Sequence, residues 1–178
     1  MKRTLQLIQE NESSSVAPEE LFKAICQDVC ENVNTDLGSV WLFNPTGERI
    51  VCQCRYDALE GTYSSGQILE KRDYPTYFQH IVEENIVSAP NAHQQHATRE
   101  FTESYFKPLG IVSLLDFILH VNFKPVGIIC CENRREIRNW SKEDEKYLLK
   151  IASYASMRFK LSYEGQQDQP DQPSEKPL

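Results

Sequence analysis

The chain has 178 residues, 40% of them hydrophobic and 25% charged, which are ordinary values for one globular domain. Its net charge of −7 argues against nucleic-acid binding, because phosphate contacts need clustered Lys and Arg. No stretch reaches the roughly 20 apolar residues of a membrane span, and the N-terminal apolar run is too short for a signal peptide. We therefore expect a cytoplasmic protein that binds neither nucleic acid nor membrane.

The first third of the chain predicts two helices and a hairpin. Residues 2–10 are weakly helical and are followed by the polar break NESSS. Pro18 then opens an amphipathic helix that continues to about residue 34, with apolar side chains at helical spacing. Residues 38–43 (GSVWLF) and 49–56 (RIVCQCRY) read as strands, and the turn sequence NPTG between them predicts a hairpin.

The middle of the chain predicts short elements around a long loop. We expect a loop over residues 61–66, a short strand near Ile68, a small helix over residues 74–84 and a strand over residues 86–89. Residues 90–108 are polar and show no clear periodicity beyond one or two helical turns near their end. A loop of that length inside a compact domain is usually functional.

Two apolar strands near the end of the folded part each carry one carboxylate, Asp116 and Glu132. If the hairpin closes around residues 122–124, Asp116 lies opposite Cys130 and Glu132 opposite Leu114, with all four on one face. A charged group that faces a packed core without partners costs several kcal/mol, by order of magnitude. This face is therefore predicted to look into a polar cavity, which suggests a sheet that builds a binding pocket.

The C-terminal part predicts a capped helix and a disordered tail. Ser141, with Asp144 three residues later, resembles a capping box at the start of a helix that runs to about residue 163. The following sequence, EGQQDQPDQPSEKPL, has no hydrophobic residue before its last position, which predicts disorder. We divide the chain into an N-terminal helical or linker segment (1–17), one domain (18–163) and a tail (164–178).

The order of elements predicts an α+β fold with α/β/α layers. Strands joined mainly by hairpins imply a central antiparallel sheet, with the long N- and C-terminal helices on one face. The small helices and the long loop would cover the other face. The terminal helix carries more apolar surface than one sheet face can cover, which predicts a helical homodimer contact formed by Tyr154, Met157, Phe159 and Leu161.

Several segments together resemble a GAF domain, the small-molecule-sensing module related to PAS, over roughly residues 18–160. The resemblance is carried by SVWLF at 39–43, by the strands GIVSLLDFIL and KPVGIICCEN, and by RNWSKEDEKYLLKIAS at the start of the last helix. A bacterial signalling branch of the family combines a strand R-x-Y with D-Y-P-x-Y-F, T-R-E-F, Y-x-x-P-L-G-I and L-D, and the last four occur here at residues 73–78, 98–101, 105–111 and 115–116. The resemblance implies a GAF/PAS-like fold.

The resemblance also implies a ligand pocket between the sheet and the small helices. Its residues would come from the first two strands, the small helix, the long loop and the acidic hairpin. The positions that match are Ser39, Trp41, Arg55, Tyr56, Asp57, Tyr74, Tyr77, Phe78, Thr98, Phe101, Tyr105, Asp116, Cys130 and Glu132. Aromatic walls with a few converging polar groups are what a small-ligand site needs.

The end of the last strand and the start of the last helix partly match a second signature of the family. Some GAF domains that bind cyclic nucleotides carry N-K…F-x-x-x-D-E, and here Asn133, Arg134, Trp140, Asp144 and Glu145 occupy similar positions. We assign these residues a structural role, in which Arg134 pairs with Asp144 and Trp140 fills the junction. The signature therefore does not predict a cyclic-nucleotide receptor.

The functional expectation is a non-catalytic bacterial sensor domain that binds a small molecule and passes occupancy through its terminal helices. No output domain follows residue 163, so we expect the signal to reach a partner protein in trans. The alternative is a protein-interaction or dimerisation module whose pocket is filled by its own aromatic side chains. The ligand, and any cofactor, cannot be named from the sequence.

Other chemistries are less well supported. A methionine sulfoxide reductase of the GAF type uses cysteines in loops over the pocket, whereas Cys52, Cys54, Cys130 and Cys131 fall in predicted strands, with only Cys130 expected at the cavity. A thiol redox sensor using the same cysteines is a further alternative. His93 and His96 of the long loop could join Asp116, Glu132 or Cys130 in a metal site. Bilin attachment, as in phytochromes, lacks the family's pocket histidine, because position 132 is Glu.

Overall fold

The computed structural model describes residues 2–10 and 18–167 of the chain and confirms the predicted α+β class. Its elements in chain order are α1 (Lys2–Glu10), α2 (Pro18–Val33), β1 (Leu37–Phe43), β2 (Arg49–Asp57), β3 (Thr62–Ser64), β4 (Ile68–Glu70), α3 (Pro75–Glu84), β5 (Ile86–Ala89), the 3-10 turn η1 (Arg99–Phe101), the π turn η2 (Thr102–Phe106), α4 (Lys107–Leu109), β6 (Ser113–Val121), β7 (Lys124–Asn133) and α5 (Lys142–Gln167). The expected loop over residues 61–66 is wrong in part, because β3 pairs there with β2.

The strands form one antiparallel sheet in the order β3-β2-β1-β7-β6-β5, and β4 pairs with the other end of β2. The pairing of β1 with β7 joins the N-terminal hairpin to the acidic hairpin. As a result, residues from β1, β2, β6 and β7 converge on one central region, although they lie almost a hundred positions apart in the sequence.

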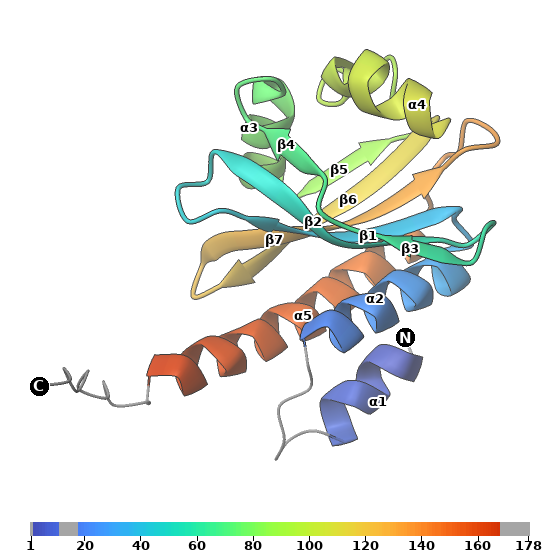
Figure 1. The fold of residues 1–178 in the computed structure, drawn as a ribbon. Helices are drawn as coiled ribbons and strands as arrows, with labels where there is room; N and C mark the ends of the chain where they lie inside the picture. Colours follow the sequence, from blue (N-terminus) through green and yellow to red (C-terminus); the bar gives the residue numbers. More distant parts are fainter. Residues whose placement is uncertain (1, 11–17, 168–178) are drawn as a thin grey trace, which may run out of the picture.

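The sheet has a different kind of cover on each side (Figure 1). Helices α2 and α5 lie together against one side, which we call the long-helix face, and α1 packs on the outer side of α2. Helix α3, the turns η1 and η2 and α4 lie against the other side, which we call the small-helix face. The predicted layers are therefore present. None of the helices in the described part of the chain is both long and apolar enough to cross a membrane.

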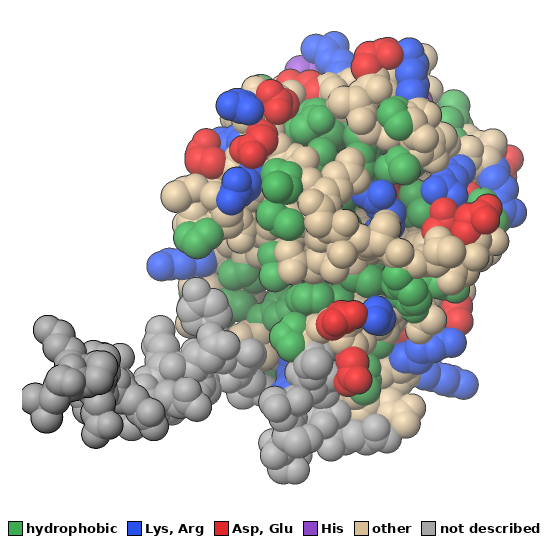
Figure 2. Space-filling view, viewed as in Figure 1, with side chains coloured by type: hydrophobic (Ala, Val, Ile, Leu, Met, Phe, Trp, Pro, Cys, Tyr) green, Lys and Arg blue, Asp and Glu red, His purple; other side chains and the backbone are tan. Residues whose placement is uncertain are grey.

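Each face has its own hydrophobic core. On the long-helix face, Ile25 and Val29 of α2 and Ile151 of α5 pack against Leu115 and Ile129 of the sheet. The core of the small-helix face is mainly aromatic, with Trp41, Tyr77, Phe101, Tyr105 and Phe106 all buried. In the view of Figure 2, hydrophobic side chains surface in a band across the middle of the molecule, and charged side chains gather mainly toward its rim.

A β-bulge in β2 decides which side chains reach the small-helix face. Val40 pairs with Cys54 but the next residue of β1, Trp41, pairs with Cys52, so Gln53 is the extra residue. The alternation of side chains therefore reverses within β2. Cys52 joins the aromatic core, Cys54 joins the opposite core, and Arg55 turns back to the aromatic side.

Close approach between α2 and the sheet depends on Gly38 of β1. A Cβ atom at this position would lie 2.6 Å from the backbone oxygen of Cys26 and 3.0 Å from the sulfur of Cys30. Because these atoms belong to α2, any side chain at residue 38 would push the helix away from the sheet. The strand therefore needs glycine for packing here and not for backbone conformation.

The start of α5 confirms the predicted capping box. The Asp144 N–H donates to Oγ of Ser141 (3.1 Å), and the Ser141 N–H donates to Oδ2 of Asp144 (2.9 Å). The helix continues to Gln167, which is four residues beyond the predicted end at residue 163. The remainder of the predicted disordered tail, residues 168–178, lies outside the described residues, as does part of the predicted linker, residues 11–17.

The turn between β6 and β7 adopts an uncommon conformation for its residues. Asn122 and Phe123 both have positive φ, 50° and 63°, as the two-residue turns of hairpins require. Asn tolerates this conformation, whereas an aromatic residue is strained in it. The Phe123 side chain is 99% exposed, so it contributes no packing in return.

Candidate functional site

Asp116 and Glu132 lie on the small-helix face of two adjacent central strands. The predicted register is confirmed, since Asp116 pairs with Cys130 and Leu114 pairs with Glu132. Both carboxyls are buried, with 1% of each residue exposed. They face the aromatic core and not the long helices, so the sheet holds two acids inside an apolar environment.

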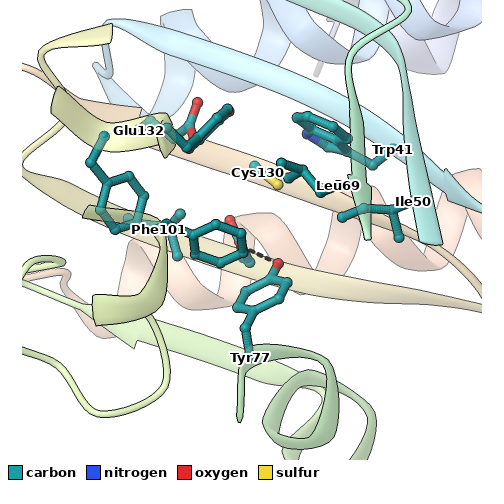
Figure 3. Close-up of a pocket in the computed structure, with 11 residues that line it drawn as sticks. Trp41, Ile50, Leu69, Tyr77, Phe101, Cys130 and Glu132 are labelled. Atoms are coloured by element: carbon teal, nitrogen blue, oxygen red, sulfur yellow. Dashed lines mark hydrogen bonds between the residues drawn. The ribbon is translucent and has the colours of Figure 1, made fainter. Parts of the chain in front are cut away.

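Each carboxyl faces one tyrosine hydroxyl and keeps one oxygen unpaired. The Tyr77 hydroxyl of α3 donates to Oδ2 of Asp116 at 2.5 Å, the bond that is dashed in Figure 3. The Tyr105 hydroxyl of η2 faces the Glu132 carboxyl and acts to lower its pKa. Among the described residues, no group pairs with Oδ1 of Asp116 or Oε2 of Glu132. An unpaired buried acceptor costs about 1–3 kcal/mol, so these two oxygens call for a partner from outside the chain, such as water or a ligand.

Burial also raises the pKa of both carboxyls. Removal from water raises the pKa of Asp116 to about 8, against the opposing effect of the Tyr77 hydrogen bond. Burial likewise raises the pKa of Glu132, although the positive charge of Arg55 acts against the shift. Asp116 is therefore largely protonated and neutral at neutral pH.

Arg55 is the buried cation on this face. It is 9% exposed, its guanidinium lies 5.8 Å from the Trp41 ring and 5.5 Å from the Tyr105 ring, and it donates to the side chain of Gln67. A longer contact of 3.4 Å joins it to the Tyr105 hydroxyl. No described residue accepts from its Nε. The Gln53 bulge places Arg55 here, and its charge partly balances that of Glu132.

A cavity of about 10 Å³ separates the acidic hairpin from the aromatic cover, which is room for one water molecule. Figure 3 shows Tyr77 and Phe101 approaching it from the helical side and Glu132, Cys130 and Trp41 from the sheet. Its lining consists of Trp41, Ile50, Leu69, Tyr77, Phe101, Tyr105, Phe106, Leu114, Asp116, Cys130 and Glu132.

Seven of the fourteen residues predicted for the pocket line this cavity. They are Trp41, Tyr77, Phe101, Tyr105, Asp116, Cys130 and Glu132. Four apolar lining residues were missed by sequence reasoning: Ile50, Leu69, Phe106 and Leu114. Leu114 could have been found from the hairpin register, since it pairs with Glu132. Ile50 and Leu69 could not, because only the pairing of β2 with β4 brings them together.

Four other predicted residues are buried nearby without reaching the cavity. Ser39 accepts from the indole N–H of Trp41 (2.9 Å), and Thr98 donates to the backbone oxygen of Ala92 (2.7 Å). Tyr74 stacks on Phe101 and shares a hydrogen bond with Ser104, and Phe78 packs edge-on against Tyr77. These residues fix the elements that carry the lining side chains.

Tyr56 and Asp57 lie elsewhere. Tyr56 packs against the core of the long-helix face and contacts the ring of Tyr63, because the bulge at Gln53 shifts the alternation of β2. Asp57 at the end of β2 accepts from Arg134 at 2.6 Å. Neither side chain lines the cavity.

The predicted pairing of Arg134 with Asp144 is wrong. Arg134 bonds instead to Asp57 and to the backbone oxygen of Leu109 (2.8 Å). Arg138 pairs with Asp144 at 3.1 Å, and its guanidinium lies 4.5 Å from the centre of the Trp140 ring. The junction between β7 and α5 is therefore structural, as expected, but it uses a different arginine.

Cys52 and Cys130, the two cysteines of the aromatic core, are poorly suited to nucleophilic chemistry, whereas interaction with the Cys26 thiol lowers the pKa of Cys54. Cys26, Cys30, Cys52, Cys54, Cys130 and Cys131 are all buried and unbridged in the described chain. Burial raises the pKa of Cys130 well above its ordinary value, and the neighbouring Asp116 acts in the same direction. Burial also raises the pKa of Cys52 to about 12. Both thiols are thus protonated at neutral pH, and a thiol is a weak nucleophile.

The histidines of the long loop are not gathered with acidic residues. Nε2 of His93 lies 2.8 Å from the backbone oxygen of Ile111, and its ring packs edge-on against Phe106. Within residues 2–10 and 18–167, no three His, Cys, Asp or Glu side chains are grouped to hold a metal ion.

The family model for the GAF domain matches residues 17–159, so this chain belongs to the GAF family. Among solved structures, the phycocyanobilin-bound GAF domain of a cyanobacterial phytochrome has a TM-score of 0.76 at 13% identity, with 95% of this chain and 97% of that one covered. The GAF domain of Thermosynechococcus elongatus PixJ has a TM-score of 0.70 at 16% identity, with 94% and 93% covered. The GAF domain of Acinetobacter phosphoenolpyruvate-protein phosphotransferase has a TM-score of 0.68 at 17% identity, with 91% and 93% covered.

At these identities the likeness is one of fold. No curated protein sequence matches the chain.

Proposed function

We propose that this GAF domain is a non-catalytic sensor that binds a small molecule between the sheet and the small helices. The observation that carries the proposal is the pair of buried carboxyls, each with an unpaired oxygen, on strands that packing alone would fill with apolar residues. Membership of the GAF family supports a signalling or sensing role. The phytochrome neighbour, whose GAF domain holds phycocyanobilin, supports a ligand site in this fold.

Transmission would run through β6 and β7 to the long helices. Leu115 and Ile129 of these strands occupy the core of the long-helix face, directly behind the acidic face. The His120 N–H of β6 also donates to Oγ of Ser156 of α5 at 3.2 Å. A ligand that displaces either strand would thus move α5. It can shift the equilibrium only by binding two arrangements with unequal affinity.

The output would be an altered contact between two copies, or with a partner protein, at the terminal helices. Leu149 and Met157 of α5 are 47% and 49% exposed, which supports an apolar contact there. Phe159, which was also expected at such a contact, packs on Phe22 of α2 with ring centres 5.7 Å apart. The side chain of Leu161 lies outside the described residues. A homodimer in the bacterial cytoplasm that signals in trans remains part of this proposal.

An interaction module is the second candidate, and the size of the cavity favours it. The aromatic side chains leave only about 10 Å³, so the pocket is filled in the present conformation. A surface groove of about 710 Å³ lies between the β1–β2 turn, α3 and the β6–β7 hairpin, with Phe43, Phe78 and Val82 in its lining. A partner protein that bound this groove would need no ligand in the central cavity.

Native mass spectrometry of the full chain tests the two candidates. The sensor predicts a co-purified small molecule that is lost in the Asp116→Leu, Glu132→Leu double variant and retained in Phe117→Leu, which changes the opposite face of β6. If the wild type carries no added mass and the double variant is simply more stable, the cavity is a structural feature. The sensor proposal is then wrong, and the interaction module is favoured.

A further inference from the structure

The ligand class follows from what the central cavity offers, and this inference rests on the proposed ligand-binding function. When both acids are ionised, the two unpaired cavity atoms, Oδ1 of Asp116 and Oε2 of Glu132, both accept hydrogen bonds. The Tyr77 hydroxyl already donates to the other oxygen of Asp116. To pair both oxygens in that state, a ligand must bring hydrogen-bond donors, and a carboxylate or phosphate would be repelled.

The charge of the site selects a cation over a neutral donor. Among the described residues, the buried acidic and basic side chains on the small-helix face are the acids Asp116 and Glu132 and the base Arg55. With both acids ionised the site carries one uncompensated negative charge. A neutral amide would satisfy the oxygens but leave this charge buried, whereas a single positive charge would remove it.

The walls of the cavity set the size and polarity of the cation. Room for one water molecule is also room for one ammonium group, which is of similar size. Aromatic rings of Phe101 and Tyr105 and the aliphatic Leu69 surround it. Leu69 and Phe101 come from the short elements β4 and η1, so they are the side chains that a short hydrocarbon chain would displace. Aromatic faces also attract a cation.

We propose that the cavity takes the ammonium group of a small primary alkylamine, held between Asp116 and Glu132 with its hydrocarbon chain against the aromatic cover. In the empty protein a proton on Asp116 removes the surplus charge. Binding of the charged amine would release that proton to bulk water, so that one positive charge leaves the site as one enters. The amine and the proton would thus compete for the same carboxylate.

The ionisable groups that face Asp116 determine how the amine and the proton compete for its carboxylate. They are Tyr77 from α3, Cys130 and Glu132 from β7, and, across the cavity, Tyr105 from η2, while β5 contributes no ionisable side chain. Burial raises the pKa of Tyr77 and of Cys130, so both stay protonated through the neutral range. Asp116 is the group that exchanges its proton, and affinity for the amine should rise with pH until Asp116 is ionised in the empty protein.

Isothermal titration calorimetry of the full chain with butylammonium tests the proposal, with butyrate, n-butanol and potassium chloride at matched ionic strength as comparison solutes. We expect saturable binding of butylammonium only. Affinity should tighten about tenfold per pH unit from pH 6 to 7.5 and level off above about pH 8, with close to one proton released at pH 6.5. Proton release is read by repeating the titration in buffers of different ionisation enthalpy.

Variants separate the cavity from the protein surface. Asp116→Asn should abolish proton release and weaken binding at pH 8 by tenfold or more, and Glu132→Gln should weaken binding while the proton release persists. Asp28→Asn removes a buried carboxyl on α2, which packs on the opposite side of the sheet, and should leave binding unchanged.

Three outcomes would overturn the amine. They are no saturable binding, equal binding of potassium ion or butanol, and binding that Asp116→Asn leaves unaltered. A neutral or anionic molecule that co-purifies and is lost in the double leucine variant would also overturn it, while leaving the sensor function in place. Absence of any ligand in both experiments would end both proposals.

Discussion

Asp116 makes a sharp prediction about how the stability of this domain depends on pH. Its ordinary pKa is 3.8, and burial raises the pKa in the folded protein to about 8. Between these values the folded state holds a proton on Asp116 that the unfolded state has lost. The contribution to stability is therefore fully present below pH 3.8 and is lost as the pH rises toward 8.

The magnitude follows from the separation between the two pKa values. One pH unit inside this window changes the free energy of unfolding by about 1.4 kcal/mol, so Asp116 alone lowers stability by roughly 3 kcal/mol from pH 5 to pH 7. That is a large part of the 5–15 kcal/mol that typically separates a folded domain from its unfolded state. Above about pH 8 the contribution is constant.

Asp116→Asn isolates this contribution, because asparagine can accept the Tyr77 hydrogen bond and cannot ionise. Urea unfolding, followed by the fluorescence of Trp41 and Trp140, gives the free energy of unfolding of both proteins at each pH. We expect the variant to gain roughly 3 kcal/mol relative to the wild type between pH 5 and pH 7. The other carboxyls titrate in both proteins, so their effect cancels in the difference between the two free energies of unfolding. A difference that stays constant within about 0.5 kcal/mol would refute the burial argument.

Three further predictions concern the framework around the site. Gly38→Ala should lower stability by about 1–3 kcal/mol, since its Cβ would lie 2.6 Å from a backbone oxygen of α2, and an unchanged urea midpoint would contradict this contact. Phe123→Gly should raise stability by about 0.5–1 kcal/mol, because glycine adopts positive φ without strain, whereas Phe123→Ala should bring no gain. Equal effects of the two variants in thermal unfolding would argue against strain at this position. Ser141→Ala should cost about 1 kcal/mol at the start of α5, with recovery in Ser141→Thr, and identical melting of all three proteins would exclude a stabilising cap.

The sequence predicts the acidic hairpin well because its signal is local. Two carboxylates in apolar strands, joined by a short turn, leave few registers open, and the predicted pairing of Asp116 with Cys130 is the observed one. The same holds for Ser141 and Asp144, whose spacing specifies the capping box without reference to the rest of the fold.

Features that depend on distant parts of the chain were beyond sequence reasoning. The bulge at Gln53 arises from the fit between β1 and β2, and it sends Tyr56 to the face opposite the one expected. The arginine that pairs with Asp144 could not be chosen, because Arg134 and Arg138 are both near in sequence and only the path of the segment 134–140 decides between them. The size of the cavity depends on how aromatic side chains from α3, η1 and η2 pack together.

The lengths of the two edge strands affect the tendency of this protein to aggregate. The inner strands β6 and β7 have nine and ten residues and are strongly apolar. A strand of this kind at an exposed edge would pair with strands of other chains. The outermost strands, β3 and β5, have only three and four residues. Each offers too few free backbone groups to template a cross-β assembly. Because the edge strands are short, the sheet can have an apolar centre without promoting aggregation.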